Sequence, residues 1–228
     1  MAEPNLNERL NRIGSLVTSG GRPSSASHCT SRYQRLAGTL SGELMTTHSG
    51  SFVVVRTLYQ LDHLHGAAIL SKSVSSEPYP LSAFTAHETV GEVAPGSLLF
   101  LDAETTGLGG TGAVPFLVGF GRMSESGFEI CQYMIPDYAD ESAMLEFLME
   151  QIAPDTTFVT YNGAAFDLPL LRDRMIINRV AREFAAGRQH IDLVHPTRRL
   201  FKRRIKDCSL INAERHLLGF QRASDTPG

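Results

Sequence analysis

The stretch FLDAETTGLGGTGAVPFLVGFGR, residues 100–122, combines two patterns that point to different chemistry. Asp102 and Glu104 end an apolar run, and side chains two residues apart on a strand lie on the same face. Two carboxylates on one face can bind one ion together, and Mg²⁺ and Mn²⁺ prefer such oxygen ligands. The residues from Gly107 to Gly112 spell G-x-G-x-x-G, which is typical of a dinucleotide phosphate site.

The surroundings of these glycines disfavour a dinucleotide site. In such a site the glycines follow a strand directly and open a helix, but here Ala103 to Thr106 intervene after Asp102. The next residues, AVPFLVGFG at 113–121, are strand formers and open no helix. We therefore expect Gly107 and its neighbours to turn the chain between two strands, and to let a nucleic-acid strand approach closely.

A third acid lies in TYNGAAFD, residues 160–167, where a predicted strand turns into a helix. One interpretation is an Asn-Gly turn followed by an acid in the first turn of a helix. The other is a site in which Asp167 joins the two acids of the earlier strand, while Asn162 braces the loop or contacts a substrate phosphate. We expect Phe166 to anchor this turn in the core and to direct Asp167 outward.

The predicted elements alternate between strands and helices. Strands are expected at 97–104, 113–122, 127–136 and 157–162. Helices are expected at 138–152, after Pro169, at 197–205 and from Ser209 to Gly219. Short links between the first three strands favour an antiparallel meander. The order β-β-β-α-β-α predicts a mixed α/β fold, in which helices flank a sheet made of this meander and a parallel strand.

The pattern upstream of residue 97 is less regular. It predicts an amphipathic helix at 5–17, a flexible Ser/Gly/Pro linker at 19–31, and a strand at 52–59 with a partner within 65–73. We expect the chain to divide into a helix and linker at 1–50, a small β extension at 51–96, and the main domain at 97–228.

Charge is distributed unevenly along the chain, whose formal net charge is −3. Residues 1–169 contain 8 Lys and Arg against 18 Asp and Glu, whereas residues 170–228 contain 13 against 6. A basic part beside acidic ligands suits an enzyme that acts on a polyanion. Four basic residues would share one face of the helix at 197–205 and contact phosphates, although a solvated helix face gives the same pattern: Arg199, Lys202, Arg203 and Lys206.

Cysteine usage and hydropathy indicate where in the cell the protein is located. Cys29, Cys131 and Cys208 are far apart in sequence, which argues against a disulfide framework or a zinc knuckle and fits a reducing cytoplasm. No apolar run reaches the roughly 18 residues of a membrane span, and the first residues, MAEPNLNERLNRIG, lack the apolar core of a signal peptide. We therefore expect a cytoplasmic protein without a membrane partner.

Four segments together resemble the YprB-type RNase H-like domain, a branch of the DEDD 3′→5′ exonuclease superfamily: LFLDAETTGLGGTGAVPFLVGFGR, TYNGAAFDLPLL, HIDLVHPTRRLFKRR and CSLINAERHLLGFQR. The resemblance covers roughly residues 97–228. It implies an RNase H-like fold and a site with two Mg²⁺ or Mn²⁺ ions. By this resemblance Asp102 would bridge both ions, Glu104 would bind the hydrolytic ion, and Asp167 would be the third acid. Nucleic acid would contact Thr105, Gly107, Asn162 and Phe166.

The sequence departs from the family pattern at its end. The pattern needs a fourth acid, an Asp on a late helix, with a His or Tyr about one turn earlier as general base. Relatives place this acid well after an R-x-x-D-x-P-G segment, and the sequence ends inside that segment, at Asp225 to Gly228. Because Asp225 belongs to the segment, it does not replace the fourth acid. We expect a truncated site with little or no turnover.

Three functions stay open at this point. The first is a metal-dependent 3′→5′ exonuclease, the second a nucleic-acid-binding module without catalysis, and the third a nucleotide-cofactor enzyme that uses the glycine loop. Metal-dependent cleavage separates the first two, and failure to bind NAD or FAD dismisses the third. The expected partner is DNA or RNA, as a single strand or a 3′ end. The sequence does not fix the oligomeric state.

Other polar residues have structural alternatives. Asp192, in the apolar HIDLVHP, is either an acid behind the site or, as we favour, a helix cap or a buried salt-bridge partner. His63 and His65 alternate like metal ligands but lack a third partner nearby, so we expect them to be structural. His190 and His195 precede the place of the expected base and are not assigned to catalysis.

Overall fold

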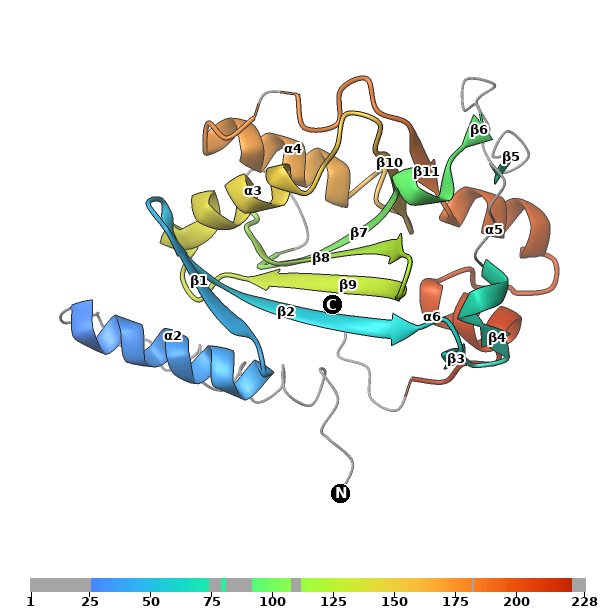
Figure 1. Ribbon diagram of the computed structural model, residues 1–228. Coiled ribbons are helices and arrows are strands. Elements are labelled where there is room, and N and C mark those ends of the chain that lie inside the picture. The colour runs from blue at the N-terminus through green and yellow to red at the C-terminus, as the bar shows by residue number, and fades with distance from the viewer. Residues whose placement is uncertain (1–25, 74–78, 81–91, 108–111, 182, 223–228) are drawn as a thin grey trace.

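The computed structural model describes residues 26–73, 79–80, 92–107, 112–181 and 183–222. The helix predicted at 5–17 and Asp225 lie outside them. Within the described residues, seven strands form one sheet in the order β1-β2-β9-β8-β7-β10-β11 (Figure 1). These strands are β1 (Glu43–Thr47), β2 (Gly50–Gln60), β7 (Leu98–Thr105), β8 (Pro115–Ser124), β9 (Gly127–Met134), β10 (Thr157–Thr160) and β11 (His190–Asp192).

The sheet combines the two strand arrangements that the sequence predicts. β7, β8 and β9 form the antiparallel meander. β10 pairs in parallel with β7 on one side and with β11 on the other, because helical segments carry the chain back to the start of the sheet between these strands. The predicted mixed α/β fold, with helices flanking the sheet, is therefore confirmed.

Strand β7 is apolar in its first half and carries exposed acids in its second half. Leu99 and Leu101 point into the main core cluster, and Phe100 packs on the opposite face of the sheet. The same alternation places Asp102 and Glu104 on the face of Phe100, and both acids are exposed. The apolar half of the strand therefore anchors it in the sheet, while its last residues carry the acids to the surface.

Helices cover both faces of the sheet (Figure 1). The helices α3 (Glu141–Glu150) and α4 (Asp167–Ile177) pack on one face, and α2 (Ala26–Leu40) packs on the other. The main cluster lies under α3 and α4 and includes Phe52 and Tyr133, whose rings meet edge to face at 5.5 Å. Burial of such large apolar side chains supplies most of the stabilisation of the fold.

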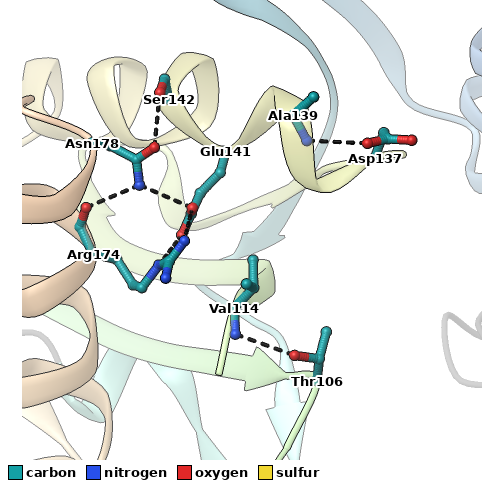
Figure 2. Close-up of polar contacts among 8 residues, drawn as sticks. All are labelled: Thr106, Val114, Asp137, Ala139, Glu141, Ser142, Arg174 and Asn178. Atoms are coloured by element: carbon teal, nitrogen blue, oxygen red, sulfur yellow. Dashed lines mark hydrogen bonds and ion pairs between the residues drawn. The ribbon is translucent and has the colours of Figure 1, made fainter. Parts of the chain in front are cut away.

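A buried ion pair joins α3 to α4 (Figure 2). Arg174 donates to Glu141 through Nε at 2.6 Å and through Nη2. The Asn178 side chain donates to Glu141 at 2.9 Å and accepts from the Ser142 hydroxyl at 2.9 Å. The Glu141 side chain is only 3% exposed, and a buried carboxylate is tolerated when it is paired in this way. These bonds hold α4, which begins with Asp167, against α3.

The prediction of a flexible linker at 19–31 is wrong for its second half, because α2 begins at Ala26. Ala37 and Leu40 of this helix are buried against Val53 and Val55 of β2. Such tertiary packing stabilises helices whose composition gives only a weak helical preference. The first half of the predicted linker, residues 19–25, lies outside the described residues.

The strand predicted at 52–59 is confirmed as part of β2. Its predicted partner within 65–73 is wrong, because β2 pairs with β1 and, along eight residues, with β9. The segment 65–73 instead falls in the hairpin of β3 (Leu64–His65) and β4 (Ala68–Ile69) and in the turn η1 (Leu70–Ser73). β2 thus belongs to the same sheet as β7, and the division of the chain into domains stays a prediction.

The remaining elements lie beside the sheet. They are β5 (Tyr79–Pro80), β6 (Glu92–Val93), η3 (Pro95–Ser97), η4 (Tyr138–Asp140), α5 (Val194–Phe201), α6 (Leu210–Ala213) and the π-helical turn η5 (Glu214–Leu218). The β3–β4 hairpin contacts the end of η5, where Ala67 donates to the Leu218 carbonyl at 2.6 Å. In the part of the chain that the structure describes, no helix is long and apolar enough to cross a membrane.

Candidate active site

Three parallel strands, β7, β10 and β11, end at the same edge of the sheet. Thr160 at the end of β10 is paired with Asp192 at the end of β11, and β7 runs on the other side of β10. In α/β sheets, ligands bind in the crevice beyond the carboxyl ends of parallel strands. Asp102, the loop 161–166 and Asp192 all lie at this edge, so it is the candidate active site.

Asp102 from β7 and Asp167 from the first turn of α4 form the acidic pair of this edge. The backbone of Ala103 acts on both carboxyl groups and lowers the pKa of each. Partial removal from water raises the pKa of Asp102, although its side chain keeps contact with solvent. Burial and, second, the charge of Asp102 raise the pKa of Asp167 to about 7. Two carboxylates that repel each other in this way favour the uptake of a proton or a cation.

Asp192 organises the loop between β10 and α4. Its Oδ1 accepts from the backbone N–H of Asn162 at 2.6 Å and of Val194 at 3.1 Å. Its Oδ2 accepts from the backbone N–H of Ala164 at 3.0 Å. Asn162 has a φ of 70°, a left-handed conformation that Asn tolerates better than most residues. The loop is therefore held by a carboxylate from the neighbouring strand, and the bond to Val194 partly agrees with the predicted helix cap.

Gly163 leaves room for the Asp167 carboxyl group. A Cβ atom at this position would lie 2.8 Å from Asp167 Oδ2 and 2.6 Å from Thr160 Cβ. Real Cβ atoms do not approach other atoms so closely, so any larger residue would displace one of these groups. Thr160 Oγ1 also accepts from the Gly163 N–H at 3.2 Å and bonds with His190 Nε2 at 2.9 Å. The glycine is needed for close packing at the acid, and not only for a turn.

The predicted metal ligands are only partly assembled. Glu104 lies exposed on the strand face of Asp102, next to a shift in the register of β7 between Glu104 and Thr105. Among the described residues, no group of three His, Cys, Asp or Glu side chains is arranged to hold an ion. The Asp102–Asp167 pair has the oxygen ligands and the unfavourable mutual charge that suit a divalent cation. The full set with Glu104 stays a prediction.

The loop after β7 closes by hydrogen bonds near its two ends. Thr105 Oγ1 donates to the Gly107 carbonyl at 2.6 Å, and Thr106 exchanges bonds with the backbone of Val114 at 3.1 and 3.2 Å. β8 then begins at Pro115, so no helix follows the glycines, as expected. A Cβ atom at Gly107 would meet nothing within 4 Å, which leaves its surface open.

Phe166 does not anchor the loop in the core, and this prediction is wrong. Its side chain is 58% exposed, whereas Leu168 two residues later is buried in the main cluster. The first turn of α4 places Leu168 toward the sheet, so Phe166 faces solvent immediately before Asp167. An exposed aromatic ring beside an acidic pair is suited to stacking on a base.

The cationic segment, residues 198–206, is shorter as a helix than predicted. α5 ends at Phe201, whose carbonyl accepts from Arg204 at 2.8 Å and from Ile205 at 2.7 Å as the chain turns. Ile205 is buried, so the chain must turn after Phe201 to bring the Ile205 side chain into the interior. The prediction that four basic residues share one helical face is therefore wrong, although all four are exposed: Arg199, Lys202, Arg203 and Lys206.

The cationic segment lies beside the loop of the acidic pair. Tyr161, the first residue of the loop, donates from its hydroxyl to the Cys208 carbonyl at 2.7 Å. Burial raises the pKa of Tyr161, and Thr197 and Arg198 are among the groups that act on it. Arg222, which pairs with Glu214 at 2.7 Å, lowers the pKa of Asp102. Positive groups therefore lie near this edge of the sheet.

The sequence alone does not indicate a role for several residues at this edge of the sheet. Thr160, Gly163 and Tyr161 were not singled out, because their roles depend on contacts between distant segments. Asp192 did carry a signal, as an acid in an otherwise apolar strand, but the sequence does not show which amides it meets. His63 and His65 pack against aromatic rings, with centroid distances of 4.6 Å to Tyr59 and 3.8 Å to Phe220, as expected for structural histidines.

Comparison with known proteins finds a matching family model and a similar bacterial protein. A family model described as RNase_H superfamily matches residues 99–228, which include both acids of the pair. The chain is also 38% identical over 135 residues to a protein of Bacillus subtilis (strain 168) named Uncharacterized protein YprB. That match covers 58% of the chain and 32% of the relative, so the chain spans about a third of the relative's length.

Proposed function

The chain belongs to the RNase H superfamily, and we propose that it acts as a metal-dependent nuclease that hydrolyses nucleic acid from a 3′ end. Its predicted resemblance to a YprB-type RNase H-like domain is confirmed at the level of the family. Membership of the superfamily suggests nuclease-like activity on nucleic acids and the use of divalent metals. The 3′→5′ direction, the two-metal chemistry and the substrate are parts of the proposal.

One observation carries the proposal, the meeting of Asp102 and Asp167 at the carboxyl ends of β7 and β10. Structural ion pairs place opposite charges together, whereas this edge places two like charges together. Like charges are costly unless a ligand neutralises them, so paired carboxylates with a raised pKa are typical of functional sites. The ligand that fits them is Mg²⁺ or Mn²⁺.

The residues that would hold the ions are Asp102, Asp167 and, if its side chain turns inward, Glu104. When bound, the ions supply an activated water and stabilise the leaving 3′ oxygen. The chain itself supplies the negative charge that selects cations, and the partial burial that strengthens electrostatic interactions there. Asn162 and Thr105 offer polar groups near the acids, and exposed Phe166 offers a ring on which a terminal base can stack.

Basic residues near the acids support a polyanionic substrate. Tyr161 of the site loop bonds to Cys208, two residues after the cationic segment, and Arg198 and Arg222 lower the pKa of Tyr161 and of Asp102, respectively. A basic surface attracts phosphates over distances comparable to the Debye length, whereas the acidic pair alone would repel them. This arrangement favours nucleic acid over a small neutral substrate.

The test is cleavage of end-labelled oligonucleotides, single-stranded and 3′-recessed, in Mn²⁺. We expect stepwise shortening from the 3′ end, its loss in EDTA, and its loss in Asp102→Ala/Glu104→Ala. The matched control is Glu150→Ala/Asp155→Ala, which removes two exposed acids away from this edge. Cleavage that survives EDTA, or that the Asp102→Ala/Glu104→Ala variant retains, contradicts the proposal.

A second function, a nucleic-acid-binding module without catalysis, is favoured by the incomplete ligand set. Asp102 and Asp192 both act on Asp167, but Asp192 is occupied by backbone amides, and among the described residues no three such side chains are arranged to hold an ion. A binder would retain the oligonucleotides in a gel-shift assay and leave their length unchanged in Mn²⁺. Binding without cleavage by the wild-type chain would therefore replace the first proposal by the second.

A further inference from the structure

We propose that Asp192 is a positioning residue, whose carboxylate holds the loop 161–166 so that Asp167 faces Asp102. This inference rests on the proposed function, in which the two acids act as a pair. Asp192 would touch neither substrate nor ion. Its charge also has a small direct effect on the pKa of Asp167, but its main action would be through the backbone of the loop. Its removal would therefore misplace Asp167 without changing any ligand.

The Asp192 carboxylate uses most of its hydrogen-bonding capacity on backbone amides. It accepts from three backbone N–H groups, those of Asn162, Ala164 and Val194, at 2.6 to 3.1 Å. A carboxylate has about four acceptor sites, so little capacity is left for an ion. The residue is also 9% exposed, which keeps water from competing for these bonds. Asp192 is therefore suited to holding the backbone and not to binding a metal.

The loop that Asp192 holds also contacts Asp167, so its position affects the position of the Asp167 carboxyl group. Asn162 keeps its left-handed conformation while its N–H is bound to Asp192. The next residue, Gly163, lies so close to Asp167 Oδ2 that a Cβ atom would come within 2.8 Å. The Gly163 carbonyl then accepts from the N–H of Leu168 at 3.0 Å, at the start of α4. Release of the loop from Asp192 would therefore shift the group against which the Asp167 carboxyl packs.

The first test needs no variant. In the metal-free wild-type protein, amide hydrogen exchange should be slowed at Asn162 and Ala164, although Ala164 lies on an exposed part of the loop. A hydrogen bond to a charged acceptor resists exchange more strongly than one to water. Exchange of both amides at the rate of an unprotected chain overturns the inference.

The second test uses Asp192→Asn, which keeps the shape of the side chain. The amino group that replaces one oxygen cannot accept a hydrogen bond, so at least one loop amide loses its partner. We expect exchange at that amide to accelerate by about 10-fold or more. Mn²⁺ affinity, followed by broadening of the Gly163 amide signal, should fall by about 10- to 100-fold, the usual effect of an outer carboxylate. Hydrolysis should fall through kcat, with KM little changed.

The matched control is Asp137→Asn, since Asp137 also accepts from a backbone N–H, that of Ala139 at 3.1 Å, outside this edge. It should leave the loop amides and the Mn²⁺ affinity unchanged. If the wild-type protein binds Mn²⁺ and Asp192→Asn binds it equally well, the positioning role is overturned and the proposed function stands. If the wild-type protein neither binds Mn²⁺ nor cleaves, the proposed function fails, and Asp192 has no acid pair to position.

Discussion

Asp102 on β7 and Asp167 at the start of α4 lie close enough for their charges to interact, although 64 other residues separate them in the sequence. The backbone of Ala103 acts on both carboxyl groups and lowers the pKa of each. Burial and the charge of Asp102 together raise the pKa of Asp167 to about 7. The titration of Asp167 therefore reports directly on the geometry of the pair.

The variant Asp102→Asn should lower the pKa of Asp167 from about 7 toward its ordinary value of 3.8. The shift should be incomplete, because burial is the larger cause and is not changed by the substitution. A ¹³C-detected NMR titration of the metal-free protein measures it, with Asp137→Asn as the control. If the pKa of Asp167 is the same in the wild-type protein and in Asp102→Asn, the two acids do not interact.

The variant Asp167→Asn should be more stable than the wild-type protein at pH 8 in EDTA. A carboxyl group whose pKa rises on folding stabilises the native state below its unfolded value, 3.8, and loses that contribution as the pH rises through about 7. We expect a gain of about 1–3 kcal/mol at pH 8, reduced for partial exposure, that shrinks toward pH 4. Urea denaturation at both pH values measures it. A variant that is less stable at pH 8 would contradict the raised pKa.

The variant Gly163→Ala should disturb the acidic pair directly. Its Cβ atom would lie 2.8 Å from Asp167 Oδ2 and 2.6 Å from Thr160 Cβ, so one of these groups must move. We expect a loss of about 1–3 kcal/mol in the free energy of unfolding, together with weaker Mn²⁺ binding. Gly38→Ala, in helix α2 with nothing within 4 Å of the added atom, makes the same chemical change and should be neutral or stabilising. Similar effects at both positions would refute close packing at Gly163.

The sequence predicts the central part of the fold because the pattern there is local. The apolar run of β7 ends at Asp102, and the short links to β8 and β9 leave little choice but a meander. The acids of the site follow from the same local pattern, since strand alternation fixes the shared face of Asp102 and Glu104. Asp167 follows from its place where a strand turns into a helix.

The parts that the sequence does not predict depend on distant contacts. Helix α2 forms because Ala37 and Leu40 bury against β2, which no window of its own residues reveals. The cationic segment leaves its helix at Phe201 because Ile205 must reach the core. Phe166 is apolar yet exposed, because Leu168, two residues later, takes the place in the core that the sequence pattern offers to both.

The variant Glu141→Gln should destabilise the whole domain, because it removes a buried carboxylate charge that pairs with Arg174 (Figure 2). Removing one member of a buried pair typically costs about 3–5 kcal/mol. The exposed pair of Arg172 and Asp173 provides the control, since Asp173→Asn should cost at most about 1 kcal/mol. Thermal and urea unfolding of both variants measure the difference. Equal costs would mean that the Glu141 pair is not buried in solution.

The variant Lys202→Ala/Arg203→Ala should weaken oligonucleotide binding and flatten its dependence on salt. Each phosphate contact contributes about 0.7 to the slope of log K against log salt for a single strand, because a counterion is released. The charge-matched control is Arg32→Ala/Arg35→Ala on helix α2, which lies on the sheet face opposite α3 and α4. Fluorescence anisotropy between 50 and about 200 mM salt measures the slope. An unchanged slope in Lys202→Ala/Arg203→Ala would assign the cationic segment to a solvated surface, and the substrate would then have to be held by Phe166, Asn162 and the groups around the acids.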